Sequence, residues 1–325
     1  MNFPKKFKKE LFSTSSDDFN EKAIRLFQYQ AQNNEIYKKY LHALNIVAED
    51  IERIEDIPFL PVSLFKHHKV ITGANVSEFF FMSSGTSETG RSRHYLHDLD
   101  FYRKVSQHIF EQQYGAISNI RLICLLPSYQ ENPHSSLIFM ADNLIKKAMP
   151  GSGYVKTSQD TIAIVRESLD EGVQPVLLGV TFALLEMAER FSQDLHGLIM
   201  IETGGMKGRR KELIREELHQ ILCDAFHLDQ IHSEYGMCEL LSQAYSLREG
   251  LFSTPPWMKV LLREVNDPFS LSQKGAGGIN IIDLANVDSC AFIETMDIGR
   301  YRQGKFEVLG RFDNSDIRGC SQLMV

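Results

Sequence analysis

The sequence lacks any apolar run that approaches the roughly 20 residues needed for a membrane-spanning helix. Its N-terminus carries lysines with no apolar segment behind them, so the pattern of a secretory signal peptide is missing as well. These two absences argue against a membrane-spanning or secreted protein. We therefore expect a cytoplasmic protein.

Positive charge is also scarce. The chain has 35 Lys and Arg residues against 42 Asp and Glu residues, which gives a formal net charge of -7 at pH 7. Proteins that bind nucleic acid by neutralising phosphates need an excess of basic side chains, so we expect no nucleic-acid partner. A local basic cluster, Lys5, Lys6, Lys8 and Lys9, is interpreted as a solvated N-terminal arm.

Paired cysteines are missing. The five cysteines are scattered without C-x-x-C spacing or nearby paired histidines, so neither a zinc site nor a disulfide framework is supported. Cys124 and Cys223 lie in apolar patterns and are expected to be buried as small hydrophobic residues. Cys238 and Cys320 lie in polar segments and are candidates for a chemical role.

The sequence does contain enough apolar material for a substantial core. Of its 325 residues, 43% are hydrophobic and 24% are charged, which is ordinary for a globular chain and fits one large α/β domain or two smaller ones. Residues 1–50 form a helical segment by their amphipathic spacing. Two prolines in the stretch Ile57 to Lys66 predict an extended connection after it.

Helix and strand patterns then alternate along the chain. Helical spacing predicts helices at 98–113, 135–148 and 159–170, and short apolar runs predict strands at 121–127, 175–180, 197–201, 259–265 and 278–284. We expect Thr181 to cap one further helix and Arg209 to Lys211 to open another, with Leu213 and Ile214 facing inward. This alternation indicates an α/β fold with a largely parallel sheet covered by helices on both faces. Ligands of such sheets bind at the strand ends.

A polar loop follows the aromatic run Phe79 to Phe81. Glycine lets backbone approach a ligand closely, Ser and Thr add hydrogen-bond donors, and Arg adds charge, so this composition is typical of a loop that wraps an anion. The candidate binding residues are Ser83, Ser84, Gly85, Thr86, Ser87, Thr89, Gly90 and Arg91.

A phosphate-binding Walker A loop is one interpretation of this stretch. Gly85 and Gly90 have the G-x-x-x-x-G spacing, but Arg91 stands where that motif requires Lys. A Walker A loop also runs directly into a helix, whereas the residues from Arg93 alternate like a strand and helical spacing begins only after Asp98. The predicted architecture is therefore strand, loop, strand.

Two later stretches also carry chemistry. The strand 197–201 is followed by Glu202-Thr203-Gly204-Gly205-Met206-Lys207-Gly208, whose glycines predict a close approach of backbone to a bound group. The second stretch is Tyr235-Gly236-Met237-Cys238-Glu239, in which an aromatic ring offers a stacking face and a carboxylate offers an oxygen ligand. Taken alone, this second stretch would be a turn and a surface charge.

Together these motifs resemble those of the adenylate-forming enzymes, the superfamily of acyl-CoA synthetases and luciferases. The polar loop is similar to their Ser/Thr/Gly phosphate loop, and Tyr235 to Glu239 resembles their Tyr-Gly-x-Thr-Glu motif with Cys238 in place of Thr. Thr295-Met296-Asp297 matches their Thr-x-Asp element, and Gly310 to Gly319 matches their hinge motif with a shorter spacing to the final Gly. The four matches occur in the family's order.

The resemblance implies a site for ATP and Mg²⁺. It places Tyr235 against adenine, Cys238 near the α-phosphate and Glu239 on the metal, and it includes Gly236 and Met237 among the nucleotide-binding residues. It also implies that Asp297 binds the ribose hydroxyls, that Arg311 contacts the nucleotide, and that Gly204 and Gly205 belong to the same pocket. The implied domains are a large domain at 1–310 and a hinge remnant with a short tail at 311–325. Because the sequence ends six residues after Gly319, we expect no counterpart of the mobile small domain that usually follows the hinge.

Within the superfamily, the chain resembles the LuxE-type acyl-protein synthetases, which resemble phenylacetate-CoA ligases in their large domain. The segments Ile57 to Lys66 and Thr203 to Gly208 and the short tail carry this likeness. Members of that family hold the acyl group as a thioester on a cysteine near the C-terminus, and Cys320 is the matching residue. No lysine matches the one that the small domain usually supplies; Lys207 and Lys305 are candidates.

These observations predict a Mg²⁺-dependent ligase that activates a carboxylic acid, by resemblance a fatty acid, as an acyl-adenylate and passes the acyl group to a thiol. The catalytic candidates are Cys320, Glu239 and Lys207. Four alternatives remain open: a ligase that uses coenzyme A or a carrier protein, an aryl-acid ligase, a P-loop NTPase, and an ATP-binding protein without catalysis. The resemblance also implies an acyl-reductase or acyl-transferase partner protein.

Overall fold

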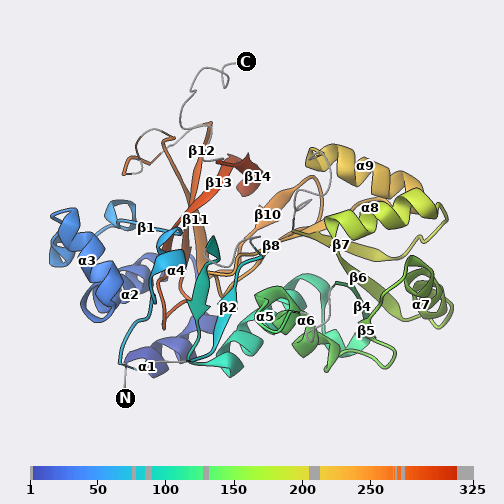
Figure 1. Ribbon diagram of the computed structural model, residues 1–325, viewed down its shortest axis with the longest axis horizontal. Coiled ribbons are helices and arrows are strands. Elements are labelled where there is room, and N and C mark those ends of the chain that lie inside the picture. The colour runs from blue at the N-terminus through green and yellow to red at the C-terminus, as the bar shows by residue number, and fades with distance from the viewer. Residues whose placement is uncertain are drawn as a thin grey trace. The chain divides into compact units, whose positions relative to one another are not determined.

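The computed structural model describes residues 3–74, 78–84, 90–126, 132–204, 213–265, 267, 269–271 and 275–312. Residue contacts divide the chain into two compact units. The central unit is Val76–Pro255, and the terminal unit combines Met1–Asn75 with Pro256–Val325 (Figure 1). The domain boundary predicted at residues 310 and 311 stays a prediction, because residues from 313 onward lie outside the described part of the chain.

The central unit is built on a sheet with the order β5-β4-β6-β7-β8-β9-β10. The first five strands pair in parallel, and the last two add antiparallel pairs. Their bounds are β4 (Ile120–Leu125), β5 (Gly153–Tyr154), β6 (Gln174–Val180), β7 (Ile199–Thr203), β8 (His232–Tyr235), β9 (Ala244–Ser246) and β10 (Leu251–Ser253). A separate hairpin consists of β2 (Phe80–Met82) and β3 (Arg93–Tyr95).

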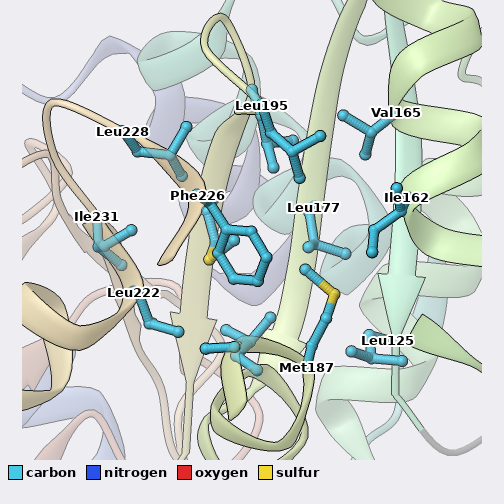
Figure 2. Packing of buried hydrophobic residues seen from close by; sticks show 14 of the residues in the cluster. Leu125, Ile162, Val165, Leu177, Met187, Leu195, Leu222, Phe226, Leu228 and Ile231 are labelled. Carbon is cyan, nitrogen blue, oxygen red and sulfur yellow. The ribbon is translucent and has the colours of Figure 1, made fainter. Parts of the chain in front are cut away.

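Helices cover both faces of this sheet. They are α5 (Leu99–Tyr114), α6 (Ser136–Ile145), α7 (Ser158–Asp170), α8 (Thr181–Arg190) and α9 (Arg215–Phe226). Side chains of α7, α8 and α9 pack on the sheet in one apolar cluster, in which Leu177, Met187 and Phe226 lie close together (Figure 2). On β4, Ile123 faces this cluster, so by strand alternation Leu122 faces the opposite layer. The α/β class predicted from the sequence is confirmed.

Two local predictions in this unit were wrong. Thr181 is the first residue of α8 and does not cap it; its hydroxyl donates instead to the carbonyl of Gly204 at 2.7 Å. Helix α9 begins at Arg215, so Leu213 and Ile214 precede it; Leu213 packs against the apolar cluster as expected, whereas Ile214 is exposed. Arg209, Arg210 and Lys211, which were expected to open that helix, lie outside the described residues.

The terminal unit joins helices from the N-terminal part of the chain to antiparallel strands from the C-terminal part. The helices are α1 (Phe3–Glu10), α2 (Phe19–Asn33), α3 (Glu35–Ala43) and α4 (Leu64–His67), with short 3-10 turns at Leu11–Ser13, Ala48–Asp50 and Ile54–Asp56. The strands are β1 (Leu60–Pro61), β11 (Met258–Arg263), β12 (Ala276–Asp283), β13 (Phe292–Arg302) and β14 (Lys305–Arg311). Strands β11 to β14 pair antiparallel in sequence order, and β1 adds to β13 in parallel. The helical N-terminal segment was predicted; the antiparallel pairing was not.

A buried amide is one of the links between the two parts of the terminal unit. The side chain of Gln30 on α2 is fully buried and donates to the backbone carbonyls of Asn286, Val287 and Ser289 at 2.9, 3.1 and 3.2 Å. Its oxygen accepts the backbone N–H of Ala291 at 2.9 Å. A single side chain thus satisfies four backbone groups of the loop between β12 and β13.

None of the described helices is long and apolar enough to cross a membrane.

Replacing Gln30 with Leu should lower the free energy of unfolding by about 3 kcal/mol or more, because it leaves several buried backbone groups without partners. Urea denaturation of the two proteins measures the difference. Gln32→Leu is the matched control, because Gln32 lies two residues further along α2 and is exposed. It should change stability by less than about 0.5 kcal/mol. Equal losses in the two variants would contradict the role given to Gln30.

Candidate functional site

The predicted strand, loop, strand architecture is confirmed in the central unit. Strands β2 and β3 pair antiparallel, with Phe81 opposite His94 and Met82 opposite Arg93. A strand therefore follows the polar loop, where a Walker A loop would continue as a helix. Helix α5 begins later, at Leu99, and the side chain of Asp98 accepts the N–H of Phe101 as its N-cap, as expected.

The two ends of the polar loop are fastened to each other. The N–H of Ser83 donates to the carbonyl of Ser92 at 3.1 Å, and the N–H of Ser92 donates to the hydroxyl of Ser83 at 2.9 Å. Ser84 is exposed, and Gly90 and Arg91 are half-buried. The remaining predicted loop residues, Gly85, Thr86, Ser87 and Thr89, lie outside the described residues.

The stretch Tyr235 to Glu239 lies directly against this loop neck. The buried imidazole of His94 donates through Nδ1 to the carbonyl of Cys238 at 2.9 Å, and the Cys238 thiol donates to the carbonyl of Ser92 at 3.9 Å. Burial, together with the charge of Glu239, raises the pKa of the Cys238 thiol well above its usual range, so this sulfur stays protonated. Two segments that were singled out separately in the sequence therefore form one structure.

The other residues of this stretch are packed to different degrees. Tyr235 is 9% exposed; its ring meets Phe252 edge-on at 5.8 Å between centroids, and its hydroxyl approaches the sulfur of Met237 at 3.7 Å. Gly236 is exposed and Met237 is half-buried. Glu239 is only 4% exposed, which is unusual for a carboxylate.

The third predicted segment meets the second at the ends of neighbouring parallel strands. Thr203 ends β7 opposite Glu234 on β8, and its hydroxyl donates to the Glu234 carboxyl group. Gly204 follows with a φ of +75°, a conformation that glycine adopts without strain. Gly205 and Lys207 lie outside the described residues.

A buried carboxylate fixes this strand end from behind. Glu202 is 3% exposed and lies 3.3 Å from Nε of Arg215 and 3.8 Å from Nε2 of His219, both on α9. Its second oxygen accepts the hydroxyl of Thr181 at 3.1 Å. Burial by itself would raise the pKa of Glu202, but the His219 hydrogen bond and the Arg215 charge outweigh it, so the pKa is lowered and Glu202 stays ionised.

Glu234 is in the opposite electrostatic situation. Burial and the charge of Glu202 raise the pKa of Glu234 to about 7, although the Thr203 hydrogen bond works against that shift. Its carboxyl group also folds over Gly236, where an added Cβ would lie 2.5 Å from Oε1. Neither Glu202 nor Glu234 was predicted, and the available signal was a run of polar residues, His232 to Glu234, inside a buried strand.

The last two predicted residues belong to the terminal unit. Asp297 on β13 lies opposite Arg311 on β14, and Arg311 Nε is 3.9 Å from Asp297 Oδ1. The Asp297 side chain is 15% exposed and that of Arg311 66% exposed. Cys320 lies outside the described residues. Among the residues that are described, no group of three or more His, Cys, Asp or Glu side chains could hold a metal ion by itself.

The raised pKa of Glu234 predicts a pH-dependent stability. Its carboxyl binds a proton up to about pH 7 in the folded protein but only up to its ordinary value of 4.5 in the unfolded chain. Stability should therefore fall by roughly 2 to 3 kcal/mol as the pH rises from 4.5 to 8. Glu234→Gln should remove this part of the pH dependence in urea unfolding, whereas Glu216→Gln on the exposed side of α9 should keep it. Parallel pH profiles for wild type and Glu234→Gln would contradict the assignment.

The chain is similar to two curated proteins, both named long-chain-fatty-acid–luciferin-component ligase. The protein from Vibrio harveyi is 24% identical over 329 residues, which cover 92% of this chain and 85% of that protein. The protein from Aliivibrio fischeri is 24% identical over 343 residues, which cover 94% and 88%. No protein-family model matches the chain.

Solved structures show the same fold. An open conformation of 2-hydroxyisobutyryl-CoA ligase, in complex with 2-HIB-AMP and CoA, superposes with a TM-score of 0.66 at 12% identity over 94% of this chain and 78% of that chain. ATP-bound MatB from Rhodopseudomonas palustris superposes with a TM-score of 0.54 at 15% identity over 73% of this chain, which spans about half (49%) of the MatB chain. The chain thus has the large-domain fold of the adenylate-forming ligases and, along 92% of its length, resembles LuxE-type fatty-acid ligases.

Proposed function

We propose that this chain is an ATP-dependent acyl-protein synthetase, an acid–thiol ligase that activates a carboxylic acid as an acyl-adenylate and transfers the acyl group to its own Cys320. The observation that carries the proposal is the similarity along 92% of the chain to ligases named for long-chain fatty acids. The fold of ligases that bind ATP or an acyl-adenylate supports it.

In the first step, a carboxylate oxygen of the acid attacks the α-phosphorus of ATP, and the bond to pyrophosphate breaks. The polar loop would receive the phosphates, and the fastened neck at Ser83 and Ser92 supports this role because it fixes where the loop begins and ends. Donors held in place before the reaction stabilise the charge on the leaving group without reorganising. Tyr235 to Cys238, Thr203 and Gly204 would also contact the nucleotide, as would Asp297 through the ribose hydroxyls and Arg311.

Glu239 is the residue that would hold Mg²⁺. The fit rests on its chemistry: it is a single, nearly buried carboxylate, and Mg²⁺ beside phosphates typically takes one or two carboxylates and completes its shell with phosphate oxygens and water. When bound, the ion would neutralise charge on the pyrophosphate. Cys238 supplies a weaker donor than the threonine of the family motif, and its thiol already faces the carbonyl of Ser92.

In the second step, the sulfur of Cys320 attacks the carbonyl carbon of the acyl-adenylate, and AMP leaves, so a thioester replaces the mixed anhydride. The thioester would then be offered to an acyl-reductase or acyl-transferase partner. The acid is proposed to be a fatty acid, as in the names of the relatives, and an aryl acid is the alternative. Lys207, or the exposed Lys305 at the start of β14, would supply the positive charge that the small domain usually provides.

The decisive experiment incubates the protein with ATP, Mg²⁺ and a panel of fatty and aryl acids and weighs the intact chain. We expect a mass gain equal to one acyl group, removed by hydroxylamine and absent in Cys320→Ser. Cys223→Ser is the matched control, since Cys223 lies on α9 and should leave the mass gain unchanged.

The other outcomes identify the alternatives. Thioester formed on added coenzyme A or carrier protein by Cys320→Ser would show a CoA or carrier-protein ligase. Release of phosphate from ATP without any acid would show an NTPase. Binding of ATP without pyrophosphate release would show an ATP-binding protein that has lost catalysis.

A further inference from the structure

A buried guanidinium lies in the terminal unit close to the predicted ribose-binding segment. Arg263 ends β11 and is 5% exposed. Its NH1 donates to the carbonyl of Ile279 and to Oδ1 of Asn280, each at 3.0 Å, and its NH2 donates to the carbonyl of Thr295 at 2.7 Å. One side chain therefore joins three adjacent strands, β11, β12 and β13.

Two carboxylates lie near the charge of Arg263. Glu294 Oε1 lies 3.6 Å from NH2. Burial lowers the pKa of Arg263, while the charges of Glu294 and Asp297 oppose that shift. Burial also raises the pKa of Glu294, against the effect of Arg263. A buried ion pair costs desolvation of both charges, so it is weak evidence for a role in stability alone.

Two residues near Arg263, Gly278 and Asn280, have features that come with its buried side chain. A Cβ at Gly278 would clash with the central guanidinium carbon of Arg263, so this side chain requires glycine at position 278. Asn280 turns its oxygen toward Arg263, and its Nδ2 is left buried with no hydrogen-bond partner among the described residues. Costs of this kind are commonly retained where they serve a function.

The segment that Arg263 holds leads directly to Asp297. Thr295, whose carbonyl binds the guanidinium, also donates its hydroxyl to the carbonyl of Ile279 at 2.7 Å and accepts the N–H of Asp297 at 3.1 Å. The backbone of Asp297 is thus fixed through Thr295 to the network around Arg263.

The same guanidinium also lies over the residue that follows Arg311. The ring centroid of Phe312 is 5.7 Å from the guanidinium carbon, and the N–H of Phe312 donates to the carbonyl of Met296 at 2.7 Å. Arg263 therefore contacts both the strand that carries Asp297 and the last described residue of the predicted hinge.

We propose that Arg263 is a positioning residue of the nucleotide site: it holds Thr295 to Asp297 so that the Asp297 carboxylate meets the ribose hydroxyls, and it holds Phe312 at the start of the hinge. This inference rests on the proposed function. Lysine cannot replace arginine in this role, because only the planar fork bonds three acceptors on two strands and stacks on a ring at the same time.

The test compares equilibrium binding of ATP and of 2′-deoxy-ATP, which lacks one of the two hydroxyls that Asp297 would bind. Wild type should prefer ATP by about tenfold or more, because a hydrogen bond to a carboxylate is lost with the analogue. Asp297→Ala should remove the preference. Arg263→Lys should reduce it at least about fivefold, and the double variant should bind the two nucleotides equally, as Asp297→Ala alone does.

A purely structural role for Arg263 predicts a different result. Arg263→Lys would then weaken both nucleotides equally and keep the ratio, and that outcome overturns the proposal. Arg53→Lys, an exposed arginine of the same unit, is the matched control and should keep the wild-type ratio. Should Arg263→Lys fail to fold, Thr295→Val is the second variant, because it removes only the hydroxyl that accepts the Asp297 N–H. It should lower the preference for ATP in the same way. An unchanged ratio in that variant also overturns the proposal.

Failure of the proposed function gives a distinct result. If wild type binds neither nucleotide, the proposed function fails and this inference fails with it. If wild type binds ATP with the expected preference and both variants keep that preference, only the role of Arg263 is refuted.

Discussion

The candidate site depends on the hydrogen bond from the imidazole of His94 to the carbonyl of Cys238. Both groups are remote in the sequence, and this bond, with the contact between the Cys238 thiol and Ser92, sets the distance between the polar loop and the stretch that ends in Glu239. Because the imidazole is fully buried, water cannot replace its partner, so breaking the bond would leave a buried donor unsatisfied. The geometry of the two segments is therefore determined together.

Each of the two units has a buried charged side chain that supports the predicted site residues. In the central unit, Glu202 accepts the hydroxyl of Thr181 on α8 and pairs with Arg215 on α9, next to the end of β7 where Thr203 lies. In the terminal unit, Arg263 donates to two strands behind Asp297. In each case a buried ionised side chain lies one step removed from the residues expected to meet the ligand and adds contacts at the strand that carries them. Such supporting groups determine how well a site is preorganised.

Much of this arrangement was visible in the sequence. Continuous apolar runs predicted β4, β6 and β7, with each boundary within two residues of the observed one. The alternation after Arg93 predicted β3. Both predictions succeeded because burial of one or both faces of a strand leaves a recognisable pattern of apolar residues. Helix α9 was misplaced because apolar spacing continued through Leu213 and Ile214, which precede the helix and leave Ile214 exposed. The supporting residues were not found, since the roles of Glu202, His94 and Arg263 come from partners far away in the sequence. No local pattern encodes such pairs.

The hydrogen bonds between Gln30 and the loop at residues 286 to 291 join segments that are synthesised at different times. The central unit is continuous, so a ribosome delivers all of it before the strands that the N-terminal helices require. At translation rates of about 5 to 20 residues per second, roughly 13 to 50 seconds pass before the partners of α2 are synthesised. During that interval the apolar face of α2, with Leu26 and Phe27, is accessible to chaperones and proteases. In nascent chains interrupted before β12 and β13, the N-terminal helices would lack the strands on which they pack.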